Sequence, residues 1–368
     1  MTRPSVASPV FALIAGGGTG GHVYPGLALA RALVARGHEP GSIRFAGARR
    51  GLEARVVPEA GFEIELLPGR GLERHLSFAN VRGLWENLVA IVKAVRLVRA
   101  LRPRVVVGVG GYASLPSVVA ARLLRVPTVV HDQDAAPGLA NRIAVRLGAR
   151  AAVSLPGTPL RAAVLTGNPV RPEFAAAARA PSRPPLVAIF GGSQGARTIN
   201  DAALDLYELW RADDHVVVHH VVGPRNLDAC RARLAALRRD GDRLAYELVG
   251  YEDHMDRLLS RSTVAVCRAG AGTVAELGAT GVPAVLVPLP GSPSDHQTRN
   301  AHTLVDAGAA VLVPDADCDG TRLDTELRSL LGDTTRLDAM SAAARSLSRA
   351  DAAERLADLV EEVAGGAL

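Results

Sequence analysis

Three glycine-rich stretches place small residues where helices are expected to begin. They read GGGTGGH at residues 16–22, GGSQGA at residues 191–196 and CRAGAGTVAELGATGVP at residues 267–283. Backbone N–H groups at the start of a helix bind phosphate or another oxyanion. The stretches therefore indicate binding of a phosphorylated ligand, although glycine there could also serve only the close packing of a strand against a helix.

Two side chains in these stretches could do chemistry or recognise a ligand. His22 ends the first turn, and a histidine titrates near neutral pH, so it can act as a base or donate a hydrogen bond. Glu276 lies one to two turns into the third expected helix, where a carboxylate could accept two bonds from a ribose diol or interact with the helix dipole. Neither of the first two turns has the spacing of the dinucleotide fingerprint, which disfavours a dehydrogenase.

The elements that must position these residues alternate along the chain. Short apolar runs at residues 10–15, 105–109, 128–131, 186–190 and 284–289 are followed by glycine or polar turns, most of them leading into stretches of helical composition. Continuous apolar strands are typical of parallel sheets that helices cover on both faces. We expect an α/β protein with two Rossmann-like domains whose parallel sheets face a central cleft.

A segment rich in Pro, Arg and Ala divides the chain into halves that begin alike. We expect an N-terminal domain over residues 1–170, a linker over 171–185, a C-terminal domain over 186–345 and a C-terminal helix over 346–368. A length of 368 residues is compatible with two domains.

Composition bounds the class of protein. The apolar share of 48% and the charged share of 21% predict a folded chain, and a net charge of +5 favours anionic partners such as nucleotides, nucleic acid or anionic lipid. Three scattered cysteines give neither a disulfide framework nor a metal site and suit a reducing compartment. No apolar run is long enough for a membrane span, so we expect a soluble protein.

The order and spacing of several stretches resemble the MurG family of glycosyltransferases over nearly the whole chain. The matching stretches are GGGTGGHVYPGLALA, GVGGYASLPSVVAA, APGLANR, GNPVR, GGSQGAR, CRAGAGTVAELGATGVPAVLVPLP and DHQTRNA. The resemblance implies the GT-B fold and inverting transfer of N-acetylglucosamine from UDP-GlcNAc to the 4-hydroxyl of the muramyl sugar of lipid I. The product would be lipid II, made for peptidoglycan synthesis at the cytoplasmic face of the cell membrane.

The resemblance also implies roles for individual residues, with His22 and Glu276 in catalysis. Ser193 would hold the diphosphate with Arg171 approaching it from the other side, and the backbone at Tyr251 and Glu252 would cradle the uracil. The residues implied for UDP-GlcNAc binding are Thr19, Gly20, Gly21, Asp134, Arg171, Ser193, Tyr251, Glu252, Ala271, Gly272, Thr273, Val274, Ala275, Glu276, Gln297 and Asn300.

One position departs from the family pattern. The chain reads HDQD at residues 131–134, where many family members read HEQN or HEAN. Asp134 can accept a hydrogen bond from a sugar but cannot donate one, and it adds negative charge beside a diphosphate. The resemblance assigns the family asparagine at this position to contact with the donor. Here either that contact is made differently or Asp134 pairs with an arginine such as Arg142.

No metal or other cofactor is expected. Helix N-termini and Arg171 would supply the positive field that the leaving diphosphate needs. The run DADCD at residues 315–319 resembles the DxD motif of metal-dependent transferases, but we interpret it as a solvated acidic turn.

A lipid-linked acceptor requires contact with an anionic membrane surface. Residues 72–85 combine apolar and basic side chains, and we expect Leu72, Leu76, Phe78 and Trp85 to insert while Arg70, Arg74 and Arg82 meet headgroups. The apolar stripe at residues 88–98 is expected to pack on the sheet instead. Proteins of cell-wall synthesis or division are further candidate partners, and nucleic acid is not expected.

Three alternatives stay open. The first is a related UDP-sugar transferase with another lipid-linked or natural-product acceptor. The second is a UDP-GlcNAc 2-epimerase of the same fold, which would not need the apolar and basic stretch at residues 70–85. The third is a non-catalytic UDP-sugar-binding scaffold, against which the presence of His22, Glu276 and Gln297 argues.

Overall fold

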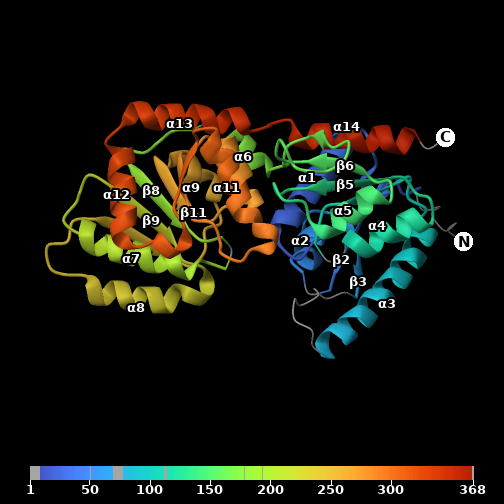
Figure 1. Cartoon of the computed structure of the whole chain (residues 1–368), viewed down its shortest axis with the longest axis horizontal. Helices are drawn as coiled ribbons and strands as arrows, with labels where there is room; N and C mark the ends of the chain where they lie inside the picture. The colour runs from blue at the N-terminus through green and yellow to red at the C-terminus, as the bar shows by residue number, and fades with distance from the viewer. Residues whose placement is uncertain are drawn as a thin grey trace, which may run out of the picture. The chain divides into compact units, whose positions relative to one another are not determined.

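The fold is given by a computed structural model that describes residues 9–49, 51–68, 78–111, 114–177, 179–192 and 194–366, with backbone alone for residues 78–87. The chain forms two compact units (Figure 1). The first comprises Met1–Arg171 and Asp351–Leu368, and the second comprises Pro172–Ala350.

The first unit is built on a parallel sheet of seven described strands in the order β3-β2-β1-β4-β5-β6-β7. The strands are β1 (Ala12–Ala15), β2 (Ile43–Ala48), β3 (Glu63–Leu67), β4 (Val105–Gly108), β5 (Thr128–Asp132), β6 (Arg150–Val153) and β7 (Val164–Leu165). The helices are α1 (Gly20–Ala35), α2 (Glu53–Glu59), α3 (Phe78–Leu101), α4 (Ser114–Leu123), α5 (Leu139–Arg146) and α14 (Ala352–Gly365).

The second unit repeats this plan with a parallel sheet of six described strands in the order β10-β9-β8-β11-β12-β13. They are β8 (Leu186–Phe190), β9 (Val217–Val221), β10 (Ala245–Val249), β11 (Val264–Cys267), β12 (Ala284–Leu286) and β13 (Ala310–Leu312). The helices are α6 (Pro172–Ala176), α7 (Arg197–Trp210), α8 (Leu227–Leu237), α9 (Met255–Arg261), α10 (Ala271–Thr280), α11 (His296–Asp306), α12 (Gly320–Leu331) and α13 (Thr334–Leu347).

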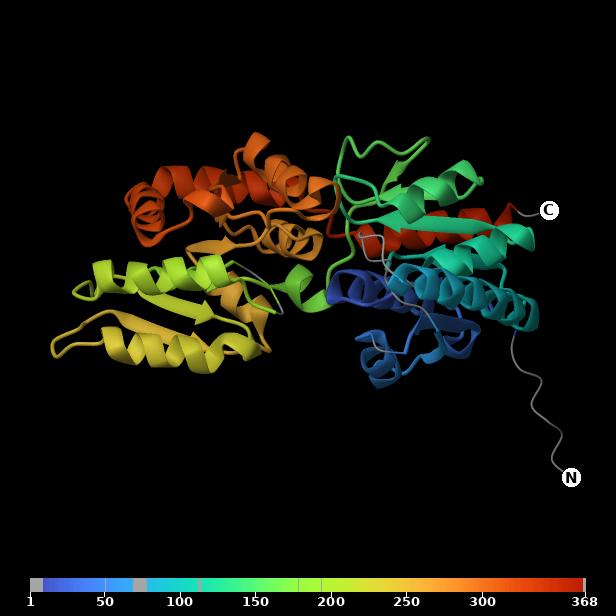
Figure 2. The same cartoon turned by 60° about the horizontal axis from the view of Figure 1, so that its bottom comes forward.

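The central strands are apolar without alternation because both of their faces are covered. Every residue of β1 and of β8 is buried, and helices lie on both sides of each sheet (Figure 2). In β1, Ile14 stands between Phe45 of β2 and Val107 of β4. The prediction of parallel sheets in two α/β domains is confirmed.

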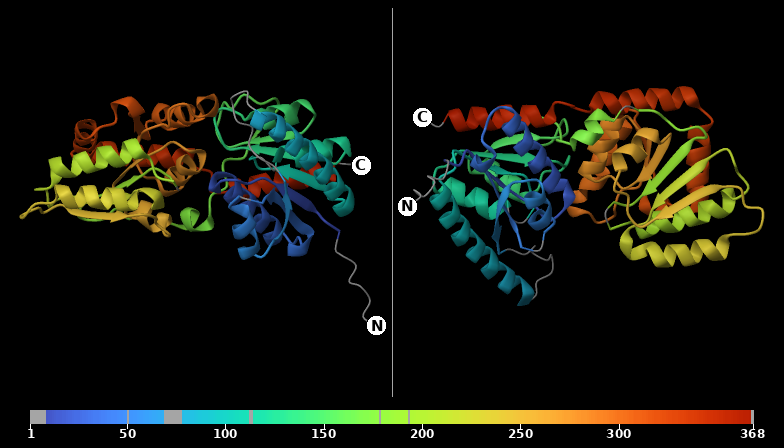
Figure 3. Two further views of the ribbon diagram at one scale, coloured as in Figure 1. Left: turned by 90° about the horizontal axis from the view of Figure 1, so that it is seen from below. Right: turned by 180° about the vertical axis from the view of Figure 1, so that it is seen from behind.

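The C-terminal helix α14 belongs to the first unit although the chain reaches it from the second. It runs beside α1 (Figure 3), and Leu356 and Val360 share a buried core with Leu29 and Leu33 of α1. Apolar burial of this kind is the main stabilising term in such a contact.

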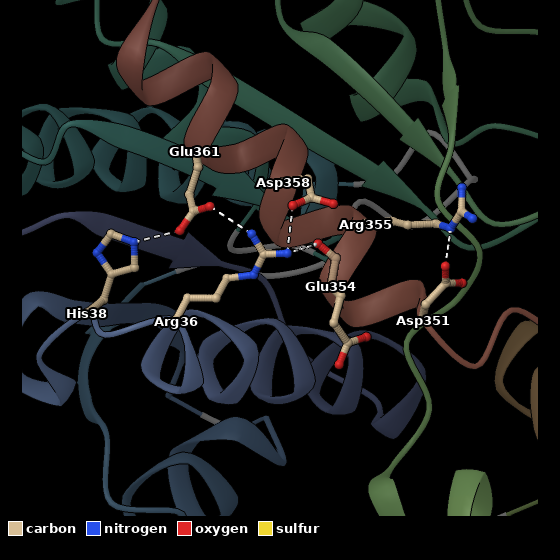
Figure 4. Close-up of polar contacts among 7 residues, drawn as sticks. All are labelled: Arg36, His38, Asp351, Glu354, Arg355, Asp358 and Glu361. Carbon is tan, nitrogen blue, oxygen red and sulfur yellow. Dashed lines mark hydrogen bonds and ion pairs between the residues drawn. The ribbon is translucent and has the colours of Figure 1, made fainter.

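Polar contacts at the edge of this core fix the register of α14. The Arg36 guanidinium lies 2.6 Å from the Asp358 carboxylate and 2.8 Å from that of Glu361 (Figure 4). His38 Nε2 lies 2.9 Å from Glu361 Oε1, and the His38 ring stacks on Phe11. These groups are partly exposed, so each pair contributes little beside the apolar core.

Candidate functional site

Strand order in each sheet reverses next to the strand that precedes a glycine turn. In the first sheet the reversal falls between β1 and β4, and in the second between β8 and β11. Ligands of open parallel sheets bind beyond the carboxyl ends of the strands at such switch points. The turns at residues 16–22, 191–196 and 267–271 all follow these strands.

The first glycine turn uses its leading N–H groups within the protein. Gly16 donates to Ala46 O, Gly17 donates to Gly110 O, and Gly18 donates to a carboxylate. The expectation that the turn offers its bare N–H groups to an oxyanion is therefore wrong for these three residues. The start of helix α1 at Gly20 and Gly21 keeps the N–H groups that a helix leaves without internal partners.

The carboxylate that meets Gly18 belongs to Glu53, which the sequence did not single out. Glu53 is only 1% exposed, and it accepts from Gly18 N at 2.7 Å and from Ala48 N at 2.8 Å. Three glycines leave the space that it fills, because a Cβ at Gly17, Gly47 or Gly51 would lie within 2.4 Å of a Glu53 side-chain atom. The turn is thus built around a buried carboxylate.

His22 lies in the first turn of α1 with its ring held on two sides. The Thr19 hydroxyl does not cap the helix but lies 3.2 Å from His22 Nδ1. On the other side, Gly110 has φ +92°, and a Cβ there would be 2.5 Å from His22 Cδ2. Only glycine therefore allows the ring to sit against the loop after β4.

The segment after β5 carries Asp134 and is organised by Asp132. The Asp132 carboxylate accepts from Asn141 Nδ2 at 2.9 Å, from Gly138 N at 3.0 Å and from Asp134 N at 3.3 Å. Burial raises the pKa of Asp132 to about 6, against the opposing effect of these bonds. Asp134 itself is partly exposed at the start of this loop.

Arg171 is the last residue of the N-terminal segment of the first unit. Its guanidinium lies 5.0 Å from the centroid of the Tyr24 ring on α1, within range of a cation–π contact. This contact places Arg171 beside the same helix that carries His22.

In the second unit, the turn at residues 191–196 connects β8 to α7. Gly195 has φ +74°, and a Cβ there would collide with the Val222 carbonyl at 1.9 Å. Asn226 Nδ2 donates to Gln194 O at 3.2 Å and to Val222 O at 2.8 Å, which ties the turn to the end of β9. Ser193 lies outside the described residues.

Helix α10 begins immediately after the turn that follows β11. Its N-terminal residues Ala271, Gly272 and Thr273 are partly exposed, as are Ala275 and Glu276, whereas Val274 is buried in the unit. Glu276 is the sixth residue of the helix, one to two turns from its start. The helix ends at Gly281, whose φ of +66° is a left-handed C-cap.

Glu252 is held by two neighbours at the end of β10. Its Oε1 accepts from His254 N at 2.8 Å, and its Oε2 lies 3.3 Å from His219 Nε2. His219 Nδ1 lies 2.9 Å from Glu247 Oε2, so one imidazole stands between two carboxylates. Tyr251, which precedes Glu252 in the chain, is exposed.

Gln297 and Asn300 lie on α11 but differ in accessibility. Gln297 is partly exposed, and its Oε1 accepts from Leu289 N at 2.9 Å. Asn300 is fully buried, and its Nδ2 donates to Ala269 O at 3.1 Å. Asn300 therefore supports the turn before α10.

The acidic run at residues 315–319 is a solvated turn in part, because Asp317 and Asp319 are exposed as expected whereas Asp315 is engaged within the protein. Asp315 pairs with the buried Arg268 and accepts from the Thr198 hydroxyl at 3.2 Å. Asp319 caps α12 by accepting from Arg322 N at 2.7 Å. Among the residues that the structure describes, no group of three His, Cys, Asp or Glu side chains could hold a metal ion.

The surface predicted to meet a membrane lies mostly outside the described residues. Arg70, Leu72, Arg74 and Leu76 fall there, and only the backbone of Phe78, Arg82 and Trp85 is described, in α3. Across the part of the chain that is described, no helix is both long and apolar enough to cross a membrane.

The prediction that the stripe at residues 88–98 packs on the sheet is wrong for its first half. Ala90, Ala94 and Val98 are buried, whereas Leu88 is 51% and Val92 45% exposed. Residues 90, 94 and 98 recur at every fourth position and form one helix face, and the small alanines allow α3 to approach α4 closely. Leu88 and Val92 lie on the opposite face.

The two units resemble the two domains of known glycosyltransferases. Family models of the N-terminal and C-terminal domains of glycosyltransferase family 28 match residues 12–153 and 186–356. The calicheamicin glycosyltransferase CalG4 shares the fold, with a TM-score of 0.69 at 18% identity over 98% of this chain and 99% of that one. The architecture is thus that of two-domain GT-B glycosyltransferases.

Relatives named UDP-N-acetylglucosamine–N-acetylmuramyl-(pentapeptide) pyrophosphoryl-undecaprenol N-acetylglucosamine transferase align over nearly the whole chain. The protein from Acidothermus cellulolyticus is 41% identical, covering 96% of this chain and 97% of its own. That from Lactiplantibacillus plantarum is 38% identical, covering 95% and 99%. The crystal structure of Acinetobacter baumannii MurG matches with a TM-score of 0.77 and 28% identity, covering 96% and 100%. The chain belongs to the MurG transferases of glycosyltransferase family 28.

Proposed function

We propose that the protein is a hexosyltransferase that moves N-acetylglucosamine from UDP-GlcNAc to the 4-hydroxyl of the muramyl sugar of lipid I, giving lipid II. The main support for this proposal is that the chain aligns over nearly its whole length with transferases named for this reaction. In the second unit, the switch-point turns after β8 and β11 precede helix N-termini of the kind that bind the diphosphate of a nucleotide sugar.

The second unit binds the donor. The N-terminus of α10 and the turn containing Ser193 face the diphosphate, and Glu276 accepts from the ribose hydroxyls. The backbone at Tyr251 and Glu252 holds the uracil, an assignment that the anchoring of Glu252 by His219 and His254 supports. Gln297 reaches the sugar hydroxyls, and Asn300 shapes the turn beneath them.

The first unit acts on the acceptor and the leaving group. Thr19, Gly20 and Gly21 border the reacting sugar, and the Arg171 guanidinium offsets charge that grows on the diphosphate. Positive charge and helix dipoles can do this without a metal ion. His22 either takes the proton from the attacking hydroxyl or donates a hydrogen bond to an oxygen of the acceptor or the leaving group.

Contact with an anionic membrane brings the lipid-linked acceptor within reach. The exposed Leu88 and Val92 extend the predicted apolar surface along α3, and Lys93, Arg96 and Arg99 follow them as basic, largely exposed residues. Apolar side chains flanked by basic ones are typical of a surface that binds anionic headgroups. The protein therefore works at the cytoplasmic face of the membrane, where other proteins of cell-wall synthesis or division are candidate partners.

Asp134 favours one second candidate, a transferase of the same class with another lipid-linked or natural-product acceptor. An aspartate at this position cannot donate to a carbonyl and adds charge beside the diphosphate. In such a transferase, another group makes the contact with UDP-GlcNAc that the resemblance assigns to the family asparagine.

Transfer of labelled GlcNAc from UDP-GlcNAc to a short-chain lipid I analogue tests the proposal. We expect lipid II from the wild type, and a loss of about 100-fold or more in His22→Ala with unchanged UDP affinity. Binding or hydrolysis of UDP-GlcNAc without transfer to lipid I would reject the acceptor. A gain of transfer in Asp134→Asn would identify that position as the point of divergence.

A further inference from the structure

We propose that Gln133 is a positioning residue for His22, with its amide locked so that its oxygen borders the His22 imidazole. The inference deepens the proposed function and rests on it, because His22 is taken as the side chain that meets a reacting oxygen. Every residue it uses lies in the first unit.

Two acceptors fix the orientation of the Gln133 amide. Gln133 is buried just after β5, and its Nε2 lies 2.8 Å from Val109 O and 3.2 Å from His131 Nδ1. A backbone carbonyl can only accept, so the nitrogen of the amide must face Val109. Its second hydrogen then points to His131, and both hydrogens of the amide are used.

His131 Nδ1 can accept a hydrogen bond from this second hydrogen because the ring carries its own proton on Nε2. Its Nε2 lies 3.1 Å from Gly167 O, which again can only accept, so Nε2 carries the hydrogen and Nδ1 offers a lone pair. Burial lowers the pKa of His131 to about 4, which keeps the ring neutral at pH 7. Ser154 Oγ, 3.2 Å from the same Nε2, completes its surroundings.

The oxygen of Gln133 consequently points to the side where His22 lies. A Cβ placed on Gly110 would have as its three nearest atoms His22 Cδ2 at 2.5 Å, His22 Nε2 at 2.9 Å and Gln133 Oε1 at 3.4 Å. The two side chains thus border the same point above the loop after β4. An acceptor oxygen there favours the forms of His22 that carry a proton on Nε2.

The arrangement connects His22 to a rigid scaffold. Val109 follows β4, His131 lies in β5, and Gly167 follows β7, so three segments hold the amide through carbonyl and imidazole acceptors. Thr19 holds the opposite ring nitrogen of His22. Gln133 on the Nε2 side and Thr19 on the Nδ1 side thus set the tautomer and the orientation of the His22 ring.

The tautomer of His22 tests this inference without relying on activity. Full-length protein labelled with ¹⁵N-histidine, with the His22 signals assigned from a His22→Gln variant, reports which ring nitrogen is protonated. We expect an Nε2–H tautomer in the wild type and a shift towards Nδ1–H in Gln133→Leu. Gln133→Met, which is close in size and has neither amide hydrogens nor a carbonyl oxygen, serves as a second variant with the same expected shift in case the first does not fold.

The kinetic readout separates this inference from the proposed function. In Gln133→Leu we expect kcat to fall about 10-fold or more with KM for UDP-GlcNAc nearly unchanged, whereas Glu59→Gln on the exposed end of α2 leaves both unchanged. Unchanged His22 signals or an unchanged kcat in a folded Gln133 variant would overturn the inference. If the tautomer changes in Gln133→Leu but the wild type transfers no GlcNAc, the proposed function is rejected and the positioning of His22 by Gln133 stands.

Discussion

The Glu53 carboxylate accepts a hydrogen bond from Gly18 N at 2.7 Å. An acidic side chain therefore occupies the inside of a glycine turn whose sequence predicts anion binding. A second bond from Ala48 N at 2.8 Å compensates the burial of its charge. A phosphate cannot share the Gly18 N–H with this carboxylate. The ligand-facing part of the turn therefore begins at Thr19, next to His22.

Glu53 and Gly51 are expected to be energetically coupled. A Cβ on Gly51 would lie 2.1–2.3 Å from the Glu53 carboxylate atoms, so Gly51→Ala should cost about 1–3 kcal/mol of unfolding free energy. Glu53→Ala leaves two buried N–H groups without an acceptor and should cost about 1–3 kcal/mol or more. In the Glu53→Ala background, the penalty of Gly51→Ala should disappear. Denaturation of the four proteins of this cycle measures the coupling, and simple additivity would contradict the packing.

Asp132 should make the first unit less stable as the pH rises from about 4 to 7. Its pKa is raised from 3.8 to about 6 by burial, so folding favours the protonated form, and this stability is lost as the pH rises through about 6. Relative to Asp132→Asn, the wild type should lose roughly 3 kcal/mol over that range. Thermal unfolding of both proteins across the pH range gives this difference in stability. Burial lowers the pKa of His131 to about 4, so His131 makes both proteins more stable as the pH rises, and its contribution cancels in the difference. A difference that does not vary with pH would contradict the burial of a titrating carboxyl group.

Helix α14 should be held by its apolar face more than by its ion pairs. Leu356 is fully buried, so Leu356→Ala should cost about 2–5 kcal/mol. Arg36 pairs with Asp358 and Glu361 at a partly exposed surface, so Arg36→Ala should cost about 1 kcal/mol or less. Chemical denaturation ranks the two variants, and a larger effect for Arg36→Ala would reverse this assignment.

Leu88 and Val92 should contribute to membrane binding. Replacing both with aspartate adds charge to the exposed apolar face of α3 and should reduce sedimentation with anionic vesicles severalfold. Leu209→Asp is the matched control, because Leu209 is 52% exposed on α7 in the second unit. Equal loss in the control, or no loss in the double variant, would exclude a role for this face of α3.

Sequence patterns predicted the elements well where the signal was local. The apolar run at residues 186–190 predicted β8 with the bounds observed, and the repeated strand–turn–helix pattern predicted both sheets. The middle of α3 was harder to predict. The large apolar residues Leu88 and Val92 are exposed, whereas the small Ala90 and Ala94 on the opposite face are buried. Helical spacing alone does not say which of two apolar faces is covered.

The residues that escaped prediction act over long separations in the chain. Glu53 reaches Gly18 across 35 positions, and Gln133 reaches Val109 across 24. A single glutamate at the start of a helix or a glutamine after a strand carries no pattern of its own, since its partners are backbone groups that every residue has. Glycines clustered at positions 17, 47 and 51 were the one signal for Glu53, and their meaning depends on the fold.

The chemical identity of the product formed by the wild-type protein shows whether it transfers N-acetylglucosamine from UDP-GlcNAc to lipid I. The protein is incubated with UDP-GlcNAc and a short-chain lipid I analogue, and the product is characterised by mass and NMR. We predict one added N-acetylglucosamine, β-linked to the 4-hydroxyl of the muramyl sugar, as inversion of the α-linked donor requires. An α-linked product, attachment at another hydroxyl, or release of free N-acetylglucosamine with the acceptor unchanged would show that the protein catalyses a different reaction.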